Sequence, residues 1–365
     1  MNGYFYVLTA IDLFVLSFMC ILTKLSESLN KKQKQGFFFA FALIAVISVL
    51  EVVTLAVDGT PAGYRWLNIL SNYLGFGLSP GVCLCLVYVM DRKKRMNRWF
   101  RAAVCCEACY LLFLALSIPA GLVFSVSADN VYSRGQYFYL YIIMYFAAIV
   151  YLSVSTFVTA REFQNRSRAL IYPLMFFLLI ETIIQVTLPE LHVTWLCVTL
   201  LSVLYFIYCS EMWNQLDALT GLLNQNSYLN RTAEMRRRGG VLVVFDVDDF
   251  KQINDRYGHS MGDRAIREIG KILSASLPED AVAIRMAGDE FIILLSRGNG
   301  KMLEDTRAAI EDGLRHFNQT TTAPFKLSFS MGLVRYNGRS TESFLNELDQ
   351  KMYAEKKAYH QEHPR

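Results

Sequence analysis

Two adjacent carboxylates, Asp289 and Glu290, lie between two short apolar runs at residues 282–286 and 291–295. Two runs of strand length joined by a short segment that contains glycine predict a β-hairpin. Carboxylates this close together repel each other, and a cation that prefers hard oxygen ligands, such as Mg²⁺, would relieve the repulsion. Taken alone, the pattern is also typical of a solvated acidic turn, and both interpretations stay open at this point.

A second group of polar residues follows an apolar run of strand length at residues 241–245. Asp246 stands where this run ends, and a loop rich in acids, with one lysine and two glycines, comes next. The members of this group that could do chemistry or shape the loop are Asp248, Asp249, Lys251, Asn254, Asp255, Gly258, His259, Gly262 and Asp263. A buried strand that delivers carboxylates to its end, with a lysine nearby, suits a metal-dependent phosphoryl-transfer site.

The two stretches together resemble the signature of the GGDEF family of diguanylate cyclases. The shared pattern is Asp-x-Asp-x-Phe-Lys-x-x-Asn-Asp-x-x-Gly-His-x-x-Gly-Asp from Asp246 to Asp263, followed by Ala-Gly-Asp-Glu-Phe at residues 287–291. A third stretch, Asp-x-Leu-Thr-Gly-Leu-x-Asn from Asp217 to Asn224, is similar to the opening motif of the family. The resemblance covers about residues 217–360 and does not include the first half of the chain.

The resemblance implies an enzyme that joins two GTP molecules into cyclic di-GMP and releases two pyrophosphates, with Mg²⁺ as its cofactor. Asp246, the backbone carbonyl of Val247, and Asp289 match the metal ligands of the family. Asp289 also matches the proposed proton acceptor, Glu290 completes the acidic pair, and Lys251 matches the group that stabilises the transition state. Because each domain holds one GTP and the reaction needs two within bonding reach, we expect a homodimer.

Other residues of the motifs divide into substrate contacts and structural positions. Four match substrate contacts of the family: Asn254 and Asp263 at the guanine edge, His259, and Lys356 near the phosphates. Five fit a structural role. We expect the charged ones to brace the loop or hairpin through ion pairs and the glycines to serve the backbone geometry. These five are Asp248, Asp255, Arg285, Gly258 and Gly262.

The chain departs from the family pattern at four places. Gln225 and Asn226 stand where the family usually has a basic pair. Ala287 replaces the first glycine of the signature, and His360 stands where the family usually has arginine. Many members carry Arg-x-x-Asp five residues before the signature, whereas residues 278–281 here read Pro-Glu-Asp-Ala, which predicts weak or absent product inhibition. Since the metal carboxylates and Lys251 are intact, we expect an active cyclase, with a catalytically inactive GTP-binding signalling module as the alternative.

Strands and helices alternate in the second half, which predicts an α/β domain. Apolar residues recur there at helical spacing and are expected to face the core, namely Ile266, Ile269, Leu273 and Leu277. The other expected elements are a helix at residues 302–318, a bent strand at 325–336 and a last helix at 344–352. The resemblance implies a central, mainly antiparallel sheet flanked by helices, similar to the nucleotidyl cyclase and polymerase palm folds.

The first half of the chain has a different composition. The 365 residues are 53% hydrophobic with a mean hydropathy of +0.28, and the apolar residues concentrate before residue 210. Seven segments approach or exceed the length that crosses a bilayer as a helix: 4–23, 36–57, 66–90, 102–126, 137–160, 169–188 and 193–210. We therefore expect a seven-helix transmembrane sensor region at residues 1–210. A short helical join at 211–216, without a Gly- or Pro-rich linker, would precede the cyclase domain at 217–365.

Lysine and arginine are distributed unevenly among the connecting segments, and this predicts an orientation. Residues 24–35, 91–101 and 161–168 are rich in lysine or arginine, whereas the alternate connections hold only Arg65, only Arg134, or none. We expect the rich segments on the cytoplasmic side of the inner membrane, which places the N-terminus outside and the cyclase domain inside, where GTP is. A net charge of +4 gives no indication of a nucleic-acid partner, and we expect none.

Acids and cysteines within the apolar half raise further questions. Asp12, Glu51, Glu107 and Glu181 fall within the expected spans, where a charge is costly. They predict a ligand pocket or ion-sensitive core, interhelical hydrogen bonds, or positions nearer the interface, and these alternatives stay open. All 8 cysteines lie in this half, which argues against a disulfide framework. The three at residues 105–109 suggest either a metal or redox site or simply small apolar side chains in a helix.

Overall fold

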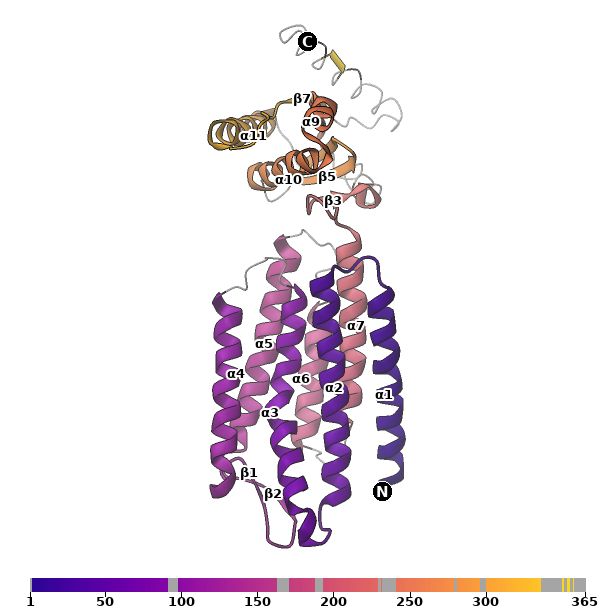
Figure 1. Cartoon of the computed structure of the whole chain (residues 1–365), viewed down its shortest axis with the longest axis vertical. Helices are drawn as coiled ribbons and strands as arrows, with labels where there is room; N and C mark the ends of the chain where they lie inside the picture. The colour runs from indigo at the N-terminus through magenta and orange to yellow at the C-terminus, as the bar shows by residue number, and fades with distance from the viewer. Residues whose placement is uncertain are drawn as a thin grey trace. The chain divides into compact units, whose positions relative to one another are not determined.

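The computed structural model describes residues 2–90, 98–162, 171–187, 193–228, 231, 241–278, 281–295, 300–335, 350, 353–354 and 357. The chain separates into two compact units, Met1–Trp213 and Asn214–Arg365. The first unit is a bundle of long helices, and the second combines a β-sheet with helices (Figure 1).

Seven α-helices are described in the first unit. They are α1 (Asn2–Leu25), α2 (Lys31–Val57), α3 (Arg65–Met90), α4 (Arg98–Ser117), α5 (Tyr139–Glu162), α6 (Ile171–Thr187) and α7 (Thr194–Asn214). Asn30 and Gln33 fix the start of α2, because the side chain of each accepts a hydrogen bond from the backbone N–H of the other. Short connections complete the unit: η1 (Ala62–Tyr64), η2 (Ile118–Ala120), and the hairpin of β1 (Phe124–Val126) and β2 (Tyr132–Arg134).

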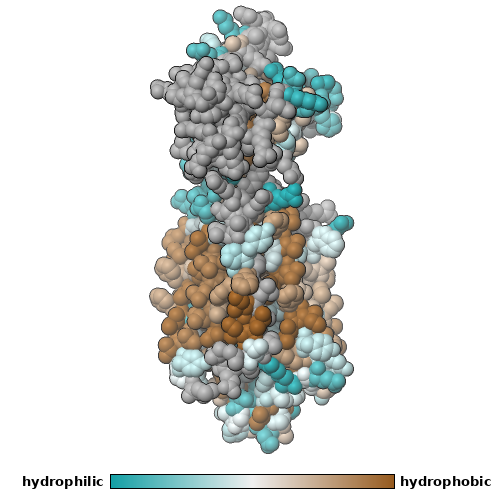
Figure 2. Space-filling model, turned by 180° about the vertical axis from the view of Figure 1, so that it is seen from behind, coloured by the Kyte–Doolittle hydropathy of each residue, from teal (hydrophilic) through white to brown (hydrophobic). Residues whose placement is uncertain are grey.

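Six of these described helical segments are long and apolar enough to cross a membrane. Large apolar side chains point outward from them, for example Phe14 at 73% and Leu116 at 71% exposure, and Figure 2 shows apolar residues over much of the visible side of the unit. The seventh expected span is not among the six, because the described part of α6 has only 17 residues. Residues 163–170 and 188–192 on either side of α6 lie outside the described part of the chain.

Polar side chains are buried between the helices of this unit. Ser48 of α2 donates a 2.6 Å hydrogen bond to Asp12 of α1, and the hydroxyls of Thr156 in α5 and Tyr205 in α7 are 2.8 Å apart. Interhelical hydrogen bonding, one of the three explanations for acids in the spans, is therefore confirmed for Asp12. The side chain of Glu181 lies outside the described residues.

A second buried network ties the α2–α3 connection to the β1–β2 hairpin. Asn130 holds a left-handed backbone conformation at φ 60°, which asparagine tolerates well, and its amide donates to the carbonyl of Val57. Asn68 donates to the side-chain oxygens of both Asn130 and Asp58, and Asp58 accepts a further bond from the backbone of Tyr132. These bonds hold the connections at this end of the bundle in one arrangement.

In the described part of the second unit, five strands form a sheet in the order β3-β5-β6-β4-β7. They are β3 (Leu223–Asn224), β4 (Val241–Val247), β5 (Ala281–Ala287), β6 (Glu290–Leu295) and β7 (Phe329–Arg335). The pairs β5–β6, β6–β4 and β4–β7 are antiparallel, and only the β3–β5 pair is parallel. The expected mainly antiparallel sheet is confirmed.

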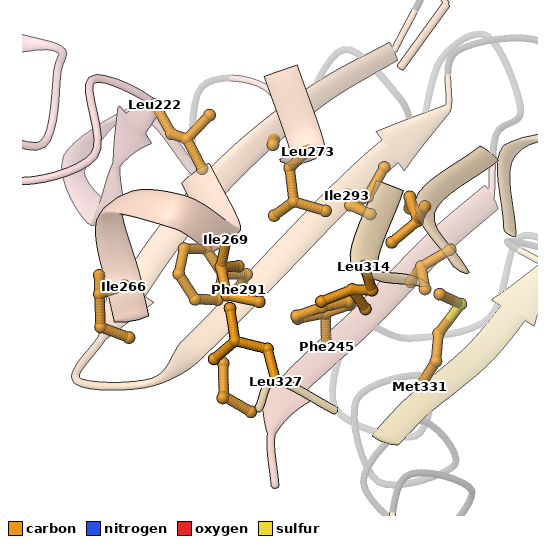
Figure 3. Close-up of a cluster of buried hydrophobic side chains, with 14 of the residues drawn as sticks. Leu222, Phe245, Ile266, Ile269, Leu273, Phe291, Ile293, Leu314, Leu327 and Met331 are labelled. Carbon is orange, nitrogen blue, oxygen red and sulfur yellow. The ribbon is translucent and has the colours of Figure 1, made fainter. Parts of the chain in front are cut away.

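Three described helices accompany this sheet, α9 (Phe250–Tyr257), α10 (His259–Ser276) and α11 (Gly300–Thr320). One face of α10 packs on the sheet, as the spacing of its apolar residues predicted: Ile266, Ile269 and Leu273 are fully buried together with Phe245 and Phe291 (Figure 3). Alternate residues of β6 serve two clusters, since Phe291, Ile293 and Leu295 belong to this core and Ile292 and Leu294 to a second one. Both faces of the central strand are therefore buried.

The remaining expectations about this unit concern one strand and two helices. β7 begins at Phe329 rather than at Phe325, but Phe325 and Leu327 are buried in the core before the strand begins, which explains why their apolar character looked like part of it. The helix expected at residues 302–318 is confirmed as α11 with two more residues at each end. The last expected helix falls at residues 344–352, of which only residue 350 is described.

Candidate active site at the β5–β6 turn

The strand register brings the two acidic stretches to one edge of the sheet. Asp246 at the end of β4 pairs with Glu290 at the start of β6, and the backbone N–H of Val247 faces the carbonyl of Asp289 at 3.4 Å. The three residues that match the family's metal ligands, Asp246, Val247 and Asp289, therefore lie side by side. Asp246 is almost fully buried, Asp289 is half-buried and Glu290 is exposed, so the edge opens to solvent at the turn.

This donor set fits a divalent cation with a preference for oxygen. Two carboxylates and a backbone carbonyl are hard ligands of the kind that Mg²⁺ takes, with water and substrate phosphates completing its coordination. Among the described residues, no group of three or more His, Cys, Asp or Glu side chains is arranged to hold a metal ion. The group at the turn offers two side-chain carboxylates and one backbone carbonyl, as expected for an ion that the nucleotide helps to bind.

The left-handed backbone conformation in this turn falls on Gly288 and not on Ala287. Gly288 has φ 48°, in the left-handed region that favours glycine, whereas Ala287 belongs to β5 and is not among the described non-glycine residues with positive φ. The replacement of the first signature glycine by Ala287 therefore costs no backbone strain. Ala287 is exposed as well, so its methyl group meets no buried neighbour.

Arg285 fixes the turn to the beginning of the domain. Its Nε and Nη2 donate to the carbonyl of Gly288 at 3.0 and 2.8 Å, and its Nη1 donates to both carboxylate oxygens of Asp217 at 3.1 and 3.2 Å. Asp217 also accepts bonds from the N–H and hydroxyl of Thr220. The predicted bracing role of Arg285 is confirmed, but its partner Asp217, 68 residues earlier, could not have been found from local sequence.

The charge of Asp217 is stabilised by these donors. Burial alone would raise the pKa of this carboxyl, but the bonds from Thr220 and the neighbouring guanidinium of Arg285 outweigh burial and lower the pKa below its ordinary value. Asp217 is therefore an anion at neutral pH and holds Arg285 beside the turn. The opening motif thus acts as an anchor for the signature loop.

A parallel anchor holds the loop after β4. Asp248 is buried, accepts a 2.6 Å hydrogen bond from the hydroxyl of Ser330 in β7, and donates its N–H to the carbonyl of Ser328. The predicted structural role of Asp248 is thus confirmed, since these hydrogen bonds tie the loop to the stretch around β7. Ser330 is a positioning residue, and no motif in the sequence pointed to its hydroxyl.

The residues matching substrate contacts lie on α9 and at the start of α10. Lys251 and His259 are exposed near the first turns of these helices, and Asp263 is exposed and pairs with Arg267 at 3.6 Å. Gly258 joins the helices at φ 82°, which confirms its predicted role in backbone geometry. Lys356 and His360 lie outside the described residues.

Gly262 serves a different purpose from the one predicted. It lies within α10 and has no positive φ, but a Cβ built on it would overlap the Oδ1 atom of Asn254. The missing side chain therefore makes room for the Asn254 amide against the first turn of α10. Asn254 and Asp263, which match the two guanine contacts, are brought to the same helix junction in this way.

The second unit is similar to domains of known proteins. Residues 214–362 match the family described as "Diguanylate cyclase, GGDEF domain". The probable diguanylate cyclase DgcI of Escherichia coli is 33% identical over 156 residues, which are 42% of this chain and 33% of the relative. The diguanylate cyclase DgcS of Shewanella oneidensis is 40% identical over 95 residues, covering 24% of this chain and 32% of the relative.

The same domain also matches a protein with a different name. The cyclic di-GMP phosphodiesterase PdeR of Escherichia coli is 29% identical over 153 residues, covering 38% of this chain and 22% of that protein. The matched segments thus span a third or less of the length of these curated relatives.

Proposed function

Since residues 214–362 form a domain of the GGDEF type, we propose that this chain is a membrane-bound diguanylate cyclase regulated by its helical unit. The observation that carries the proposal is the pairing at the end of β4, where Asp246 lies opposite Glu290 and Val247 faces Asp289. Acids from two separate stretches meet there beside a solvent-exposed turn. A decayed domain would retain the fold without a reason to keep these acids together.

The substrate is GTP, and the residues divide the work as follows. Asp246, the carbonyl of Val247 and Asp289 would hold Mg²⁺, which when bound offsets the negative charge of the triphosphate. Asp289 takes the proton of the attacking 3′-hydroxyl, with Glu290 beside it. Lys251, exposed on the first turn of α9, offsets the charge that develops on the departing pyrophosphate.

Recognition of the base falls to the α9–α10 junction. The amide of Asn254 and the carboxylate of Asp263 offer donor and acceptor groups to the edge of guanine, while His259 and Lys356 contribute further substrate contacts. In each half of the reaction the 3′-oxygen of one GTP forms a bond to the α-phosphorus of the other, and the bond to pyrophosphate breaks. One domain holds one GTP, so the active form is a homodimer.

The alternative is a catalytically inactive module that binds GTP and acts through a partner. The match to a protein named as a phosphodiesterase keeps this alternative in view, because the same domain type occurs there. The alternative predicts GTP binding without turnover and no effect of the metal carboxylates on any product.

The experiment uses the purified full chain in lipid nanodiscs with GTP and Mg²⁺, and measures cyclic di-GMP and pyrophosphate. We expect both products in a 1:2 ratio from the wild type and none from Asp289→Asn. Asp312→Asn, an exposed acid on α11, is the matched control and should behave as the wild type. GTP binding by a wild type that forms no product would establish the inactive module instead.

The helical unit is proposed to lie in the inner membrane with the N-terminus outside and no nucleic-acid partner. The six long apolar helices support membrane insertion, and the charge distribution of the connections supports the orientation. A green fluorescent protein fused to the C-terminus should fluoresce in cells, and alkaline phosphatase fused there should be inactive. An active phosphatase fusion would reverse the proposed orientation.

A further inference from the structure

Three helices of the first unit meet at one buried carboxylate. Asp12 of α1 is 2% exposed, Ser48 of α2 is 2% exposed and Thr199 of α7 is fully buried. Ser48 donates a hydrogen bond of 2.6 Å to Asp12 Oδ2. The Thr199 hydroxyl and the carboxyl of Glu51 on α2 also lie within interaction range of the Asp12 carboxyl.

Two oxygens in this cluster have unmet bonding capacity. Asp12 Oδ1 and Thr199 Oγ1 are both buried, and neither has a partner at hydrogen-bond distance and angle among the described residues. Buried polar atoms without a partner are rare in folded proteins and call for a specific explanation, such as a bound ion. Within the described residues, Asp12 also forms no salt bridge with lysine or arginine.

The charges of the cluster favour a cation. A lone carboxylate away from water is costly, and a second carboxyl, Glu51, within interaction range raises the cost further. A positive charge between Asp12 Oδ1 and Thr199 Oγ1 would satisfy both atoms and offset the repulsion. Hydrogen bonding from Ser48 alone leaves half of the Asp12 carboxylate without a donor.

The ligand atoms narrow the choice of cation. Carboxylate and hydroxyl oxygens are hard ligands and exclude metals that prefer sulfur or imidazole. Ca²⁺ takes six to eight oxygens and usually several carboxylates, which this cluster does not provide. We propose that Asp12, Ser48 and Thr199, with Glu51 nearby, form a binding site for a small monovalent cation, with Na⁺ as the best match.

The site joins helices that are far apart in the sequence. α2 and α7 are in contact through Phe37 and Phe206, whose ring centroids are 5.0 Å apart, and a cation at Asp12 would tie α1 to the same pair. Occupancy should therefore stabilise the packing of these three helices. α7 ends at Asn214, where the second unit begins, so its packing is the part of the bundle nearest to that unit along the chain.

The test measures binding and stability of the full chain in nanodiscs at pH 7.5, independently of cyclase activity. Thermal unfolding is followed in NaCl, KCl or choline chloride at constant ionic strength, and retention of ²²Na⁺ is measured directly. We expect a saturable rise of the unfolding midpoint in Na⁺ on the order of 5 °C over choline. Stoichiometric retention of ²²Na⁺ should accompany it.

The variants identify the atoms involved. Asp12→Asn should abolish both the midpoint shift and ²²Na⁺ retention, and Thr199→Val should weaken retention at least about tenfold. Glu107→Gln removes another buried acid, on α4, and should leave both readouts unchanged. If Asp12→Asn does not fold, Thr199→Val and the direct binding to wild type still decide the question.

Three results would overturn the proposal. The first is a wild type without saturable Na⁺ binding, and the second is equal Na⁺ binding in Thr199→Val and wild type. The third is a midpoint that changes with pH but not with Na⁺, which would make Asp12 a protonated acid instead of a cation ligand.

Discussion

The two units differ in the side chains that they expose. The helical unit exposes large apolar residues such as Phe14 and buries Asp12 and Asn68 inside. Figure 2 shows apolar residues over much of its visible side. The second unit buries aromatic residues such as Phe245 and Phe291 in its core (Figure 3), and it presents Asp289 and Glu290 at the solvent-exposed β5–β6 turn. One chain therefore combines a unit with a largely apolar surface and a unit whose large apolar side chains lie mainly in its core.

The difference teaches that an acid has to be interpreted by its surroundings. Asp289 stands half-buried at a solvent-exposed turn beside other acids, where it can meet a metal ion and a nucleotide. Asp12 stands among helices, where its charge needs a fixed neighbour or a bound cation. The role that we propose for aspartate is therefore catalytic at the turn of the second unit, whereas Asp12 makes a hydrogen bond between two helices of the first unit.

The largest effect is expected from removing charge at the exposed edge. Asp246→Asn or Asp289→Asn should lower the rate of cyclic di-GMP formation at least about 10²–10³-fold, because each loses a ligand that acts on the reacting phosphates. Thermal unfolding of the full chain should change little, since neither acid belongs to the apolar core. Activity near that of the wild type in either variant would remove these residues from the site.

The next prediction contrasts the two units by truncating one apolar side chain in each. Ile269→Ala removes a fully buried side chain from the core of the second unit and should destabilise it by about 2–5 kcal/mol. Phe14→Ala in the helical unit removes a side chain with 73% exposure, so little packing within the protein is lost. Unfolding of nanodisc-embedded chains, followed with a probe in each unit, checks both values. Equal destabilisation by the two changes would contradict the outward-facing role of Phe14.

A smaller effect is expected at the anchor of the signature turn. Arg285→Gln should lower stability by about 1–2 kcal/mol and reduce activity, because the bonds to Asp217 and to the Gly288 carbonyl are lost together. Arg315→Gln, which breaks a surface pair with Asp312 at 3.1 Å, should cost at most about 0.5 kcal/mol. Matching losses in the two variants would mean that the anchor contributes no more than a surface ion pair.

The same anchor predicts a pH dependence with a defined sign. The pKa of Asp217 is lowered in the folded chain, so its contribution to stability is complete above the unfolded-state pKa of about 3.9 and is lost as the pH falls through the folded value. The stability difference between wild type and Asp217→Asn should therefore be constant near pH 7 and shrink in acid. Unfolding midpoints measured from pH 7 to pH 3 check this, and a difference that grows in acid would refute it.

Gly262→Ala tests the space reserved for Asn254. The added methyl overlaps Asn254 Oδ1 and should displace the amide, which raises the KM for GTP about tenfold while the domain stays folded. In an Asn254→Ala background the same change should add little, because the displaced group is already absent. Additive effects of the two changes would show that Gly262 acts independently of Asn254.

Local sequence was enough to predict the elements that carry the site. The apolar run before Asp246, the hairpin around Gly288 and the helical spacing from Ile266 to Leu273 are short-range signals, and each element is confirmed. Whether Ala287 strains the turn could be decided only from the backbone angles. They show that the positive φ falls on Gly288 and not on Ala287.

Contacts between distant segments could not be predicted in the same way. The bond between Arg285 and Asp217 and the meeting of Asp12 with Thr199 depend on how separate elements pack, and a single sequence carries no signal for either pairing. The apolar stretch before β7 was misjudged because burial and strand formation leave the same pattern in so short a segment.

The smallest expected effect concerns the product. Residues 278–281 stand where related cyclases carry Arg-x-x-Asp, and both ends of this stretch differ chemically from that motif. Pro278 follows the end of α10, and its carbonyl accepts a hydrogen bond of 3.0 Å from the N–H of Ala281. Ala281 begins β5 and is fully buried in the core, where a carboxylate would have no solvent.

Inhibition by cyclic di-GMP should consequently be weak and relieved by GTP. An arginine fork can bind a phosphodiester and stack on guanine, whereas proline can do neither, and losing such charge-assisted bonds weakens binding at least about tenfold. Any residual inhibition should come from product in the active site, so rates measured at several GTP concentrations should converge as GTP rises. Restoring only the arginine with Pro278→Arg should change the inhibition little. The second position of the motif is Ala281, which is buried in the core and cannot hold a charge. Tight inhibition that excess GTP does not relieve would reveal a separate product site, and the surface around residues 278–281 would then have to bind the product through groups other than the missing pair.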